Sequence, residues 1–162
     1  MDPPDAAAHK MAVEALMDAQ LIVIGPGSLY TSILPNLMVK GIADAVHASQ
    51  ARKVFVTNIA TQQGETDGYS VIDHYDALTG HTFPSIADYV IANDNPRELG
   101  PEFYGSPVRY HGESLNGASL HLEDLTDDLH PVRHHSEKLA SAIMDVYHGD
   151  GKPKPLIRLG MS

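Results

Sequence analysis

The sequence contains no cysteine and no tryptophan, and it is poor in basic residues. Without cysteine the chain can form no disulfide, no thiolate metal site and no cysteine nucleophile, which fits a reducing cytoplasm. Its 162 residues include 21 acids but only 11 bases, giving a formal net charge of −10 at pH 7. An acidic chain without clustered lysine or arginine is not expected to bind nucleic acid or an anionic membrane surface.

Long hydrophobic segments are absent as well. No apolar run approaches the roughly 20 residues that a membrane-spanning helix needs, and the N-terminus lacks the basic and apolar regions of a signal peptide. We therefore expect a cytoplasmic protein. Hydrophobic residues nevertheless make up 43% of the sequence, so the chain can bury a core, and its length fits one domain.

Two kinds of apolar pattern alternate along the first part of the chain. Helical spacing predicts helices, and short continuous apolar runs predict strands that are buried on both faces. The expected order is helix 5–18, strand 21–24, helix 36–47, strand 53–58, helix 70–80 and strand 88–93. Strands that alternate with helices are typical of βαβ units, so we expect a three-layer α/β fold with a doubly wound, mostly parallel sheet.

Individual residues indicate where these helices begin and which side chains face inward. Met17 belongs to the apolar stripe of the first helix, and Asn36 is a suitable N-cap for the second, in which Met38 is expected to face inward. Ser70 and Asp73 have the spacing of a capping pair at the start of the third helix.

The pattern changes after Asn93. Short β-like pieces are expected at 108–110 and 119–122 with a turn at 116–117 between them, and a last helix is expected from 134 to 147. Within a single domain covering residues 1–162, we divide the chain into a ligand-binding βα core, 1–95, and a part with smaller β segments and the C-terminal helix, 96–162.

Candidate ligand-binding residues follow the predicted strands, because open parallel sheets bind ligands at the carboxyl ends of their strands. Loop 25–32 begins Gly-Pro-Gly and contains the hydroxyl groups of Ser28, Thr31 and Ser32, a combination that suits phosphate. Loop 58–69 is rich in carboxamides and hydroxyls, which can bind sugar hydroxyls or a nucleobase edge. Asn93 begins a third such loop. A tight turn, a solvated loop and an Asx turn are the respective structural alternatives.

Neither catalysis nor a metal is required by the spacing of the acids and histidines. Glu65, Asp73 and His74 lie near the candidate loops, but no pair has a spacing that demands acid–base chemistry. The group His130, His134 and His135 invites a zinc interpretation but lacks a helix-spaced ligand pair, which favours solvated or helix-start histidines.

Two motifs carry a family resemblance. The runs IVIGPGSLYTSILPNLMVKGI and KVFVTNIATQQGETDGYSVIDH, with a strand ending in IAN and the segment RHHSEKLASAI, resemble the YvcK-like family of gluconeogenesis factors, which is related to the phospholactate transferase CofD. The resemblance covers most of residues 3–147. It implies a Rossmann-like, cytoplasmic bacterial protein that binds a nucleotide sugar of the UDP-N-acetylglucosamine type and influences gluconeogenic growth, cell shape and envelope synthesis.

The family also has an earlier Gly-rich strand-to-helix turn that is absent here, so we expect a fragment or a shortened homologue without the first βα units. The resemblance implies that the loops 25–32 and 58–66 line the ligand site. From these two polar loops and the resemblance together, we expect the diphosphate near Gly27 and Ser28, and the polar atoms of the base or sugar near Asn58, Thr61 and Gln62. With Asn93, the candidate binding residues are Gly25, Gly27, Ser28, Leu29, Tyr30, Thr31, Ser32, Asn58, Thr61, Gln62, Gly64, Glu65, Thr66 and Asn93.

Two other functions remain open on the sequence. The first is a CofD-type phosphotransferase that makes a phospholactyl deazaflavin coenzyme; it would need a metal such as Mg²⁺, for which Glu65, Asp67 and Asp73 are the nearby carboxylates. The second is an oligomerisation or partner-binding module without a ligand. We expect a homo-oligomer, because a shortened sheet exposes apolar surface that a second copy can bury.

Overall fold

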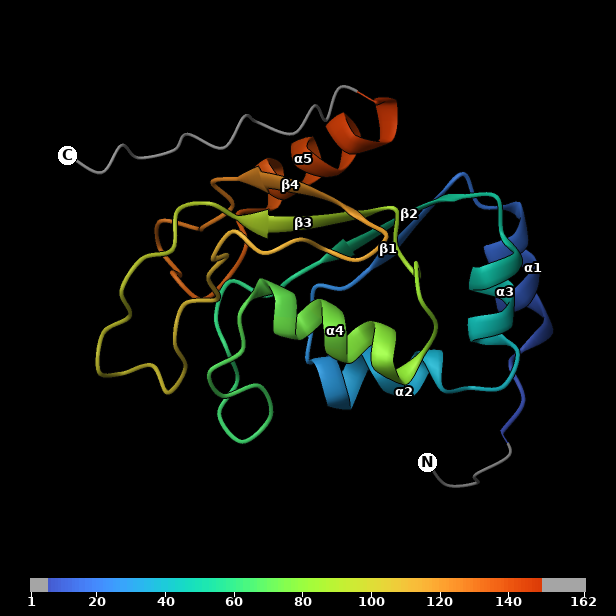
Figure 1. The fold of residues 1–162 in the computed structure, drawn as a ribbon, viewed down its shortest axis with the longest axis horizontal. Helices are drawn as coiled ribbons and strands as arrows, with labels where there is room; N and C mark the ends of the chain where they lie inside the picture. The colour runs from blue at the N-terminus through green and yellow to red at the C-terminus, as the bar shows by residue number, and fades with distance from the viewer. Residues whose placement is uncertain (1–5, 150–162) are drawn as a thin grey trace.

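The fold is that of a computed structural model, and residues 6–149 are the ones it describes. One sheet of four strands is formed in the order β1 (Leu21–Ile24), β2 (Arg52–Val56), β3 (Tyr89–Asn93) and β4 (Ser119–Glu123). Each strand pairs in parallel with the next, so all four carboxyl ends lie at one edge of the sheet (Figure 1). The predicted parallel α/β architecture is confirmed.

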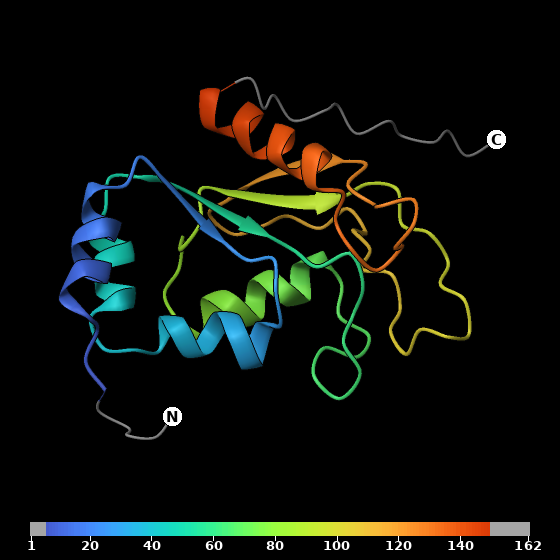
Figure 2. The ribbon, with the colours of Figure 1, turned by 180° about the vertical axis from the view of Figure 1, so that it is seen from behind.

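Helices lie on both faces of this sheet. Between residues 6 and 149 the helices are α1 (Lys10–Asp18), η1 (Leu29–Ile33), α2 (Leu34–Leu37), α3 (Ile42–Ala48), α4 (Val71–His81) and α5 (Ser136–His148), and α1 and α3 pack together beside one end of the sheet (Figure 1, Figure 2). Helices α2 and α4 lie on one face and α5 lies on the other (Figure 2). No helix between residues 6 and 149 has the combination of length and apolar character that crossing a membrane requires.

The surroundings of the central strand β2 explain why its sequence is one continuous apolar run. Phe55 faces α4, where its ring lies 6.4 Å from that of Tyr75. Val54 and Val56 belong to the opposite core cluster, which includes Val146 of α5. All three strand residues are buried. A strand covered on both faces has no solvent side on which polar residues would alternate with apolar ones.

Helix α4 begins as predicted. The Ser70 side chain accepts a hydrogen bond from the Asp73 backbone N–H at 3.2 Å, and Asp73 in return accepts one from the Ser70 backbone N–H at 2.8 Å. This reciprocal capping box fixes the first turn of the helix. The helix ends at His81, one residue beyond the predicted stop at Gly80.

The single helix predicted over 36–47 is wrong. Helical structure already starts at Leu29, α2 ends at Leu37, and α3 begins only after Gly41, whose φ of +92° is a left-handed conformation that glycine adopts without steric cost. Asn36 lies inside α2 instead of capping it, and its Nδ2 donates to the carbonyl oxygen of Ser32 at 2.6 Å. Met38 is 60% exposed, not inward-facing.

The first helix is shorter than predicted. It begins at Lys10, where the His9 side chain accepts a hydrogen bond from the Met11 N–H; the predicted start at Asp5 lies outside the described residues. The segment before it is extended, because the Ala8 N–H donates to the carbonyl oxygen of Lys40. Met17 is 46% exposed, whereas Leu16 of the same apolar stripe packs against the core.

The part of the chain after Asn93 joins the same sheet. Residues 108–110 do not form the predicted strand; instead the Val108 N–H donates to the Ile59 carbonyl and extends the loop after β2. The second predicted piece is strand β4, which pairs with β3. The turn at 116–117 is present, with Gly117 at φ +84°. The predicted last helix is α5, which begins at Ser136.

Candidate functional site

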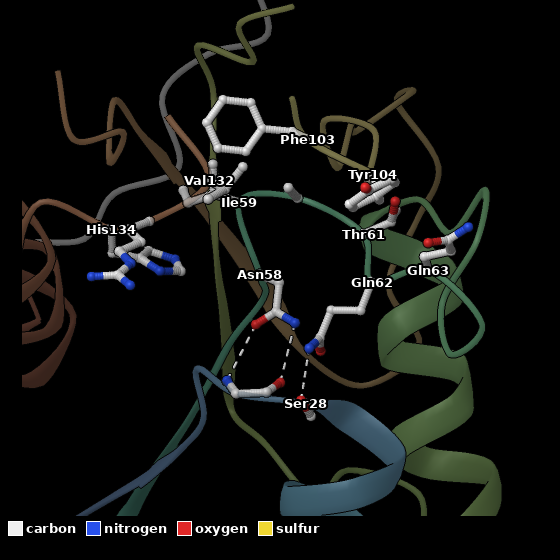
Figure 3. A pocket seen from close by; sticks show the side chains of 14 residues that line it. Ser28, Asn58, Ile59, Thr61, Gln62, Gln63, Phe103, Tyr104, Val132 and His134 are labelled. Carbon is white, nitrogen blue, oxygen red and sulfur yellow. Dashed lines mark hydrogen bonds between the residues drawn. The ribbon is translucent and has the colours of Figure 1, made fainter. Parts of the chain in front are cut away.

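A cleft of about 640 Å³ opens at the carboxyl ends of β1 and β2 (Figure 3). The loops after these two strands form part of its wall, and segments from the later part of the chain complete it. The lining residues are Gly27 and Ser28, residues 58–63, residues 103–105 and residues 132–134. This is the edge at which open parallel sheets bind ligands. Both predicted divisions of the chain, 1–95 and 96–162, therefore contribute to the cleft.

Hydrogen bonds join the first loop to the second beside this cleft. The Asn58 side chain pairs with the backbone of Gly27: the Gly27 N–H donates to Oδ1 at 3.2 Å, and Nδ2 donates to the Gly27 carbonyl at 3.1 Å (Figure 3). Gln62 Nε2 donates to Ser28 Oγ at 2.8 Å. The Ser28 hydroxyl keeps its own proton to donate to a ligand.

Further hydrogen bonds join the same two loops outside the cleft. Thr31 donates to a carboxylate oxygen of Glu65 at 2.8 Å, and the hydroxyls of Tyr30 and Tyr69 lie 2.8 Å apart. The hydrogen bond with Tyr69 raises the pKa of Tyr30. Tyr30, Thr31 and Glu65 were expected to line the ligand site; the structure uses them to fasten the two loops together, and they are not among the residues that line the cleft.

Three more candidates from the first loop lie elsewhere. Gly25 has φ +83°, and an added Cβ would lie 2.9 Å from the carbonyl oxygen of Val56, so no larger residue fits this turn. Leu29 is 1% exposed and belongs to the core. Ser32 and Gly25 line a separate groove beside β1.

The remaining candidates have local partners. Thr66 is fully buried, and its hydroxyl accepts a hydrogen bond from the Gln62 N–H at 2.9 Å. Gly64, at φ +77°, forms a turn in which its N–H donates to Asp67. Asn93 accepts a hydrogen bond from the Leu125 N–H at 2.9 Å and lines a smaller cavity of about 240 Å³. Of the predicted set, the structure brings together Gly27, Ser28, Asn58, Thr61 and Gln62 at the cleft.

Sequence reasoning missed the residues that close the cleft from the opposite side, namely Phe103, Tyr104, Arg133 and His134. Arg133 matters most because it supplies the cation that neither predicted loop contains. Within residues 6–149, every lysine and arginine side chain except Arg133 and Lys40 has a hydrogen bond or ion pair to the chain itself. The guanidinium of Arg133 is thus available to an anionic ligand.

His134 adds an acceptor to the same wall. Its Nε2 lies 3.0 Å from the carbonyl oxygen of Thr57, at the end of β2. Because a carbonyl oxygen only accepts, Nε2 carries the proton and Nδ1 carries the lone pair. Burial lowers the pKa of His134 to about 4, so the ring is neutral near pH 7.

The histidines do not converge on a metal. His135 is the N-cap residue of α5, as the helix-start interpretation expected, and the His130 N–H donates to Asp127. Among the described residues, no three His, Asp or Glu side chains are grouped so that they could hold a metal ion.

The carboxylates nominated for Mg²⁺ are also used by the chain. Glu65 accepts from Thr31, Asp67 from Gly64 and Asp73 from Ser70. No carboxylate from residues 6–149 lines the cleft. A magnesium ion that bridges phosphates is ordinarily held by one or two protein carboxylates, so the residues present do not fit that cofactor.

Comparison with known proteins agrees with this architecture. The family model described as 2-phospho-L-lactate transferase CofD matches residues 1–111. The chain belongs to the CofD family. The match confirms the relationship that the two motifs indicated, and it includes both loops that form the floor of the cleft.

Within this CofD relationship, the chain is similar to proteins named gluconeogenesis factor. It is 47% identical to the one from Halalkalibacterium halodurans over 95% of this chain and 49% of that protein. It is 40% identical to the one from Listeria monocytogenes over 89% of this chain and 46% of that protein. The chain thus spans about half the length of the curated relatives it matches.

A crystal structure shows the same fold. The UPF0052-family protein from Bacillus halodurans superposes with a TM-score of 0.80 at 36% identity, covering 88% of this chain and 48% of that one. This similarity confirms the α/β fold independently of the strand pairing described above.

Proposed function

We propose that the cleft binds a nucleotide sugar of the UDP-N-acetylglucosamine type. The observation that carries the proposal is the guanidinium of Arg133, which has no partner among residues 6–149. The other described residues that line the cleft are neutral, and many of them have hydrogen-bonding groups. Arginine binds phosphate oxygens with two parallel N–H groups, and charge-assisted bonds of this kind are stronger than neutral ones. One cation in an otherwise uncharged cleft suits a phosphate-containing ligand with a large polar remainder.

The loop residues provide that polar remainder with partners. The Ser28 hydroxyl can donate to a phosphate oxygen, and Gln62 Oε1 is buried without a partner in the described part of the chain. Thr61 accepts from the Ser106 N–H at 2.9 Å and keeps its hydroxyl proton. Tyr104 is 82% exposed at the rim, where an aromatic ring can cover a nucleobase. The side-chain amide of Asn58 is instead hydrogen-bonded to the backbone of Gly27 and holds that residue in place.

The similarity to proteins named gluconeogenesis factor supports a role in gluconeogenic growth. We propose in addition, as the sequence motifs led us to expect, that the protein acts in the cytoplasm and influences cell shape and envelope synthesis.

Calorimetric titration tests the binding. UDP-N-acetylglucosamine is added to the purified chain and, in parallel, to a version extended to the length of its relatives. We expect saturable heat in at least one of the two proteins. Absence of heat in both, with a thermal unfolding curve that shows each protein to be folded, contradicts nucleotide-sugar binding.

The alternative enzymatic function is the phosphotransferase activity named in the family description. Glu65 is one of the two acids in the loop after β2, and it accepts a hydrogen bond from Thr31. If Glu65 held a catalytic metal, Glu65→Gln would abolish transfer of a phospholactyl group to a deazaflavin acceptor. Full transfer by that variant would show that Glu65 has only the structural role seen here.

We also propose that the free edge of β1 mediates self-association. Within residues 6–149, strand β1 pairs only with β2. Its residues carry no charge, and Val23 is 40% exposed. A groove of about 360 Å³, lined largely by aliphatic side chains such as Ile22, Ile33 and Leu37, runs beside this strand. An uncharged edge is a ready template for pairing, and a two-fold axis would place the β1 strands of two copies antiparallel.

A further inference from the structure

The two ring nitrogens of His134 have different surroundings. Nε2 is used by the fold, because it donates to the carbonyl oxygen of Thr57 at 3.0 Å. Nδ1 has no hydrogen-bond partner in the described part of the chain, yet it is not among the buried polar atoms left without one. Nδ1 therefore remains accessible, on a residue that lines the cleft (Figure 3).

We infer that His134 Nδ1 accepts a hydrogen bond from a hydroxyl group of the ligand, beside the phosphate bound by Arg133, so that the cleft selects a phosphorylated sugar over phosphate or diphosphate alone. This inference rests on the proposed function and assigns it a specificity-determining residue. The adjacent positions of Arg133 and His134 in one cleft-lining segment provide a cationic donor and a neutral acceptor next to each other.

The protonation of the His134 ring explains why it binds a hydroxyl group while Arg133 binds the phosphate. The Thr57 carbonyl can only accept, so it fixes the tautomer with hydrogen on Nε2 and leaves a lone pair on Nδ1. A lone pair repels a phosphate oxygen and attracts an O–H group. Burial also disfavours the charged imidazolium, and the resulting pKa of about 4 keeps the acceptor intact near pH 7.

A purely structural role for His134 would account for the hydrogen bond of Nε2 but not for the accessible Nδ1. Anchoring the segment before α5 to the end of β2 requires Nε2 and the Thr57 carbonyl alone. It does not require an accessible acceptor at Nδ1. A glutamine in place of histidine retains one amide donor for Thr57 and one carbonyl acceptor, whereas phenylalanine retains the ring shape and neither polar group.

The test compares the unmodified chain, His134→Phe and His134→Gln in calorimetric titrations with three probes: UDP-N-acetylglucosamine, UDP and inorganic pyrophosphate. For His134→Phe we expect an affinity about 10-fold weaker for UDP-N-acetylglucosamine, the usual effect of leaving one polar partner unsatisfied, and pyrophosphate affinity within about twofold of the unmodified chain. His134→Gln should recover part of the loss. A loss that extends to UDP assigns the hydroxyl to the ribose, and a loss confined to UDP-N-acetylglucosamine assigns it to the second sugar.

Nitrogen NMR of the unmodified chain provides a measurement that does not depend on a variant folding. The two-bond proton–nitrogen spectrum should show His134 with hydrogen on Nε2, and the Nδ1 resonance should move upfield as the nucleotide sugar is added. Equal losses for pyrophosphate and UDP-N-acetylglucosamine in His134→Phe, or an unmoved Nδ1 resonance at saturation, overturn the inference alone. Failure of the unmodified chain and its extended version to bind any nucleotide probe overturns the proposed function instead.

Discussion

Asn58 and Gly27 are joined by a reciprocal pair of hydrogen bonds, 3.2 and 3.1 Å long, across the ends of β2 and β1. The side-chain amide of Asn58 thus acts on the Gly27 backbone much as a neighbouring strand would. The pair extends the contact between the two strands into the loops that follow them. It fixes the floor of the cleft before any ligand arrives.

Asn58→Ala should therefore destabilise the protein. It removes two hydrogen bonds, each contributing about 1 kcal/mol, so the free energy of unfolding should fall by about 1–2 kcal/mol. Urea unfolding followed by circular dichroism measures the change. Gln63→Ala is the matched control, because Gln63 is an exposed carboxamide in the same loop and its replacement should change stability by less than about 0.5 kcal/mol. Equal effects of the two substitutions would contradict the role given to Asn58.

Arg133→Gln should weaken the binding of UDP-N-acetylglucosamine by about 10-fold to 100-fold, since it removes charge-assisted hydrogen bonds to phosphate. Stability should be unchanged because the guanidinium has no partner among residues 6–149. Lys40→Gln removes the same charge from a cation that is also unpaired in that part of the chain but does not line the cleft, and it should leave affinity unchanged. Calorimetry distinguishes a local contact, which only Arg133→Gln disturbs, from a general charge effect, which both substitutions would produce.

Stability should decrease on mild acidification because of His134. Burial lowers its pKa from 6.5 in the unfolded chain to about 4 in the folded one, so the unfolded state binds the proton more readily. The contribution is fully present above pH 6.5 and is lost as the pH falls towards 4, by at most about 3 kcal/mol.

Urea unfolding at pH 7 and at pH 4.5 measures this loss. His134→Gln should show a smaller decrease, although some will remain because burial also lowers the pKa of His74. An identical pH dependence in the variant and the unmodified chain would show that His134 does not titrate in this range.

Val23→Lys should dissociate the oligomer proposed at the β1 edge. A charged side chain at an exposed edge position opposes pairing with another strand. Sedimentation velocity should show a dimer for the unmodified chain and a monomer for the variant. Met144→Lys, an apolar-to-lysine change at a 44% exposed position of α5, should remain dimeric. A monomer for the unmodified chain at high concentration would refute self-association through β1.

The helices differ in how far their sequences determine them. For α4, local chemistry is sufficient, because Ser70 and Asp73 form the capping box within one turn of the chain. For the segment 29–48, the same reasoning fails. The apolar spacing there is compatible with one helix, but the left-handed Gly41 and the contact between Ala8 and Lys40 divide it. Both features depend on the tertiary path of the chain and not on the apolar spacing within this segment.

The candidate site divides in a similar way. The positions of Gly27, Ser28 and Gln62 at the strand ends follow from the parallel sheet alone. The side chains of Tyr30, Thr31 and Glu65 are equally suited to binding a ligand, yet they join the two loops to each other. Packing, and not residue type, decides whether such a side chain points into the cleft or towards the neighbouring loop. Sequence spacing cannot distinguish a hydroxyl that meets a ligand from one that meets a carboxylate of the neighbouring loop.

By itself, the sequence determined the parallel α/β fold, the family and the edge of the sheet at which the cleft lies, because each depends on periodicity or on contiguous motifs. Only the tertiary structure decided what completes that cleft. Arg133 and His134 are about seventy residues from Thr61 and Gln62 in the chain, and they reach the same cleft because α5 packs on the far face of β2 and carries the preceding segment to the end of that strand. Long-range packing thus placed a cation in a cleft that the local sequence left uncharged.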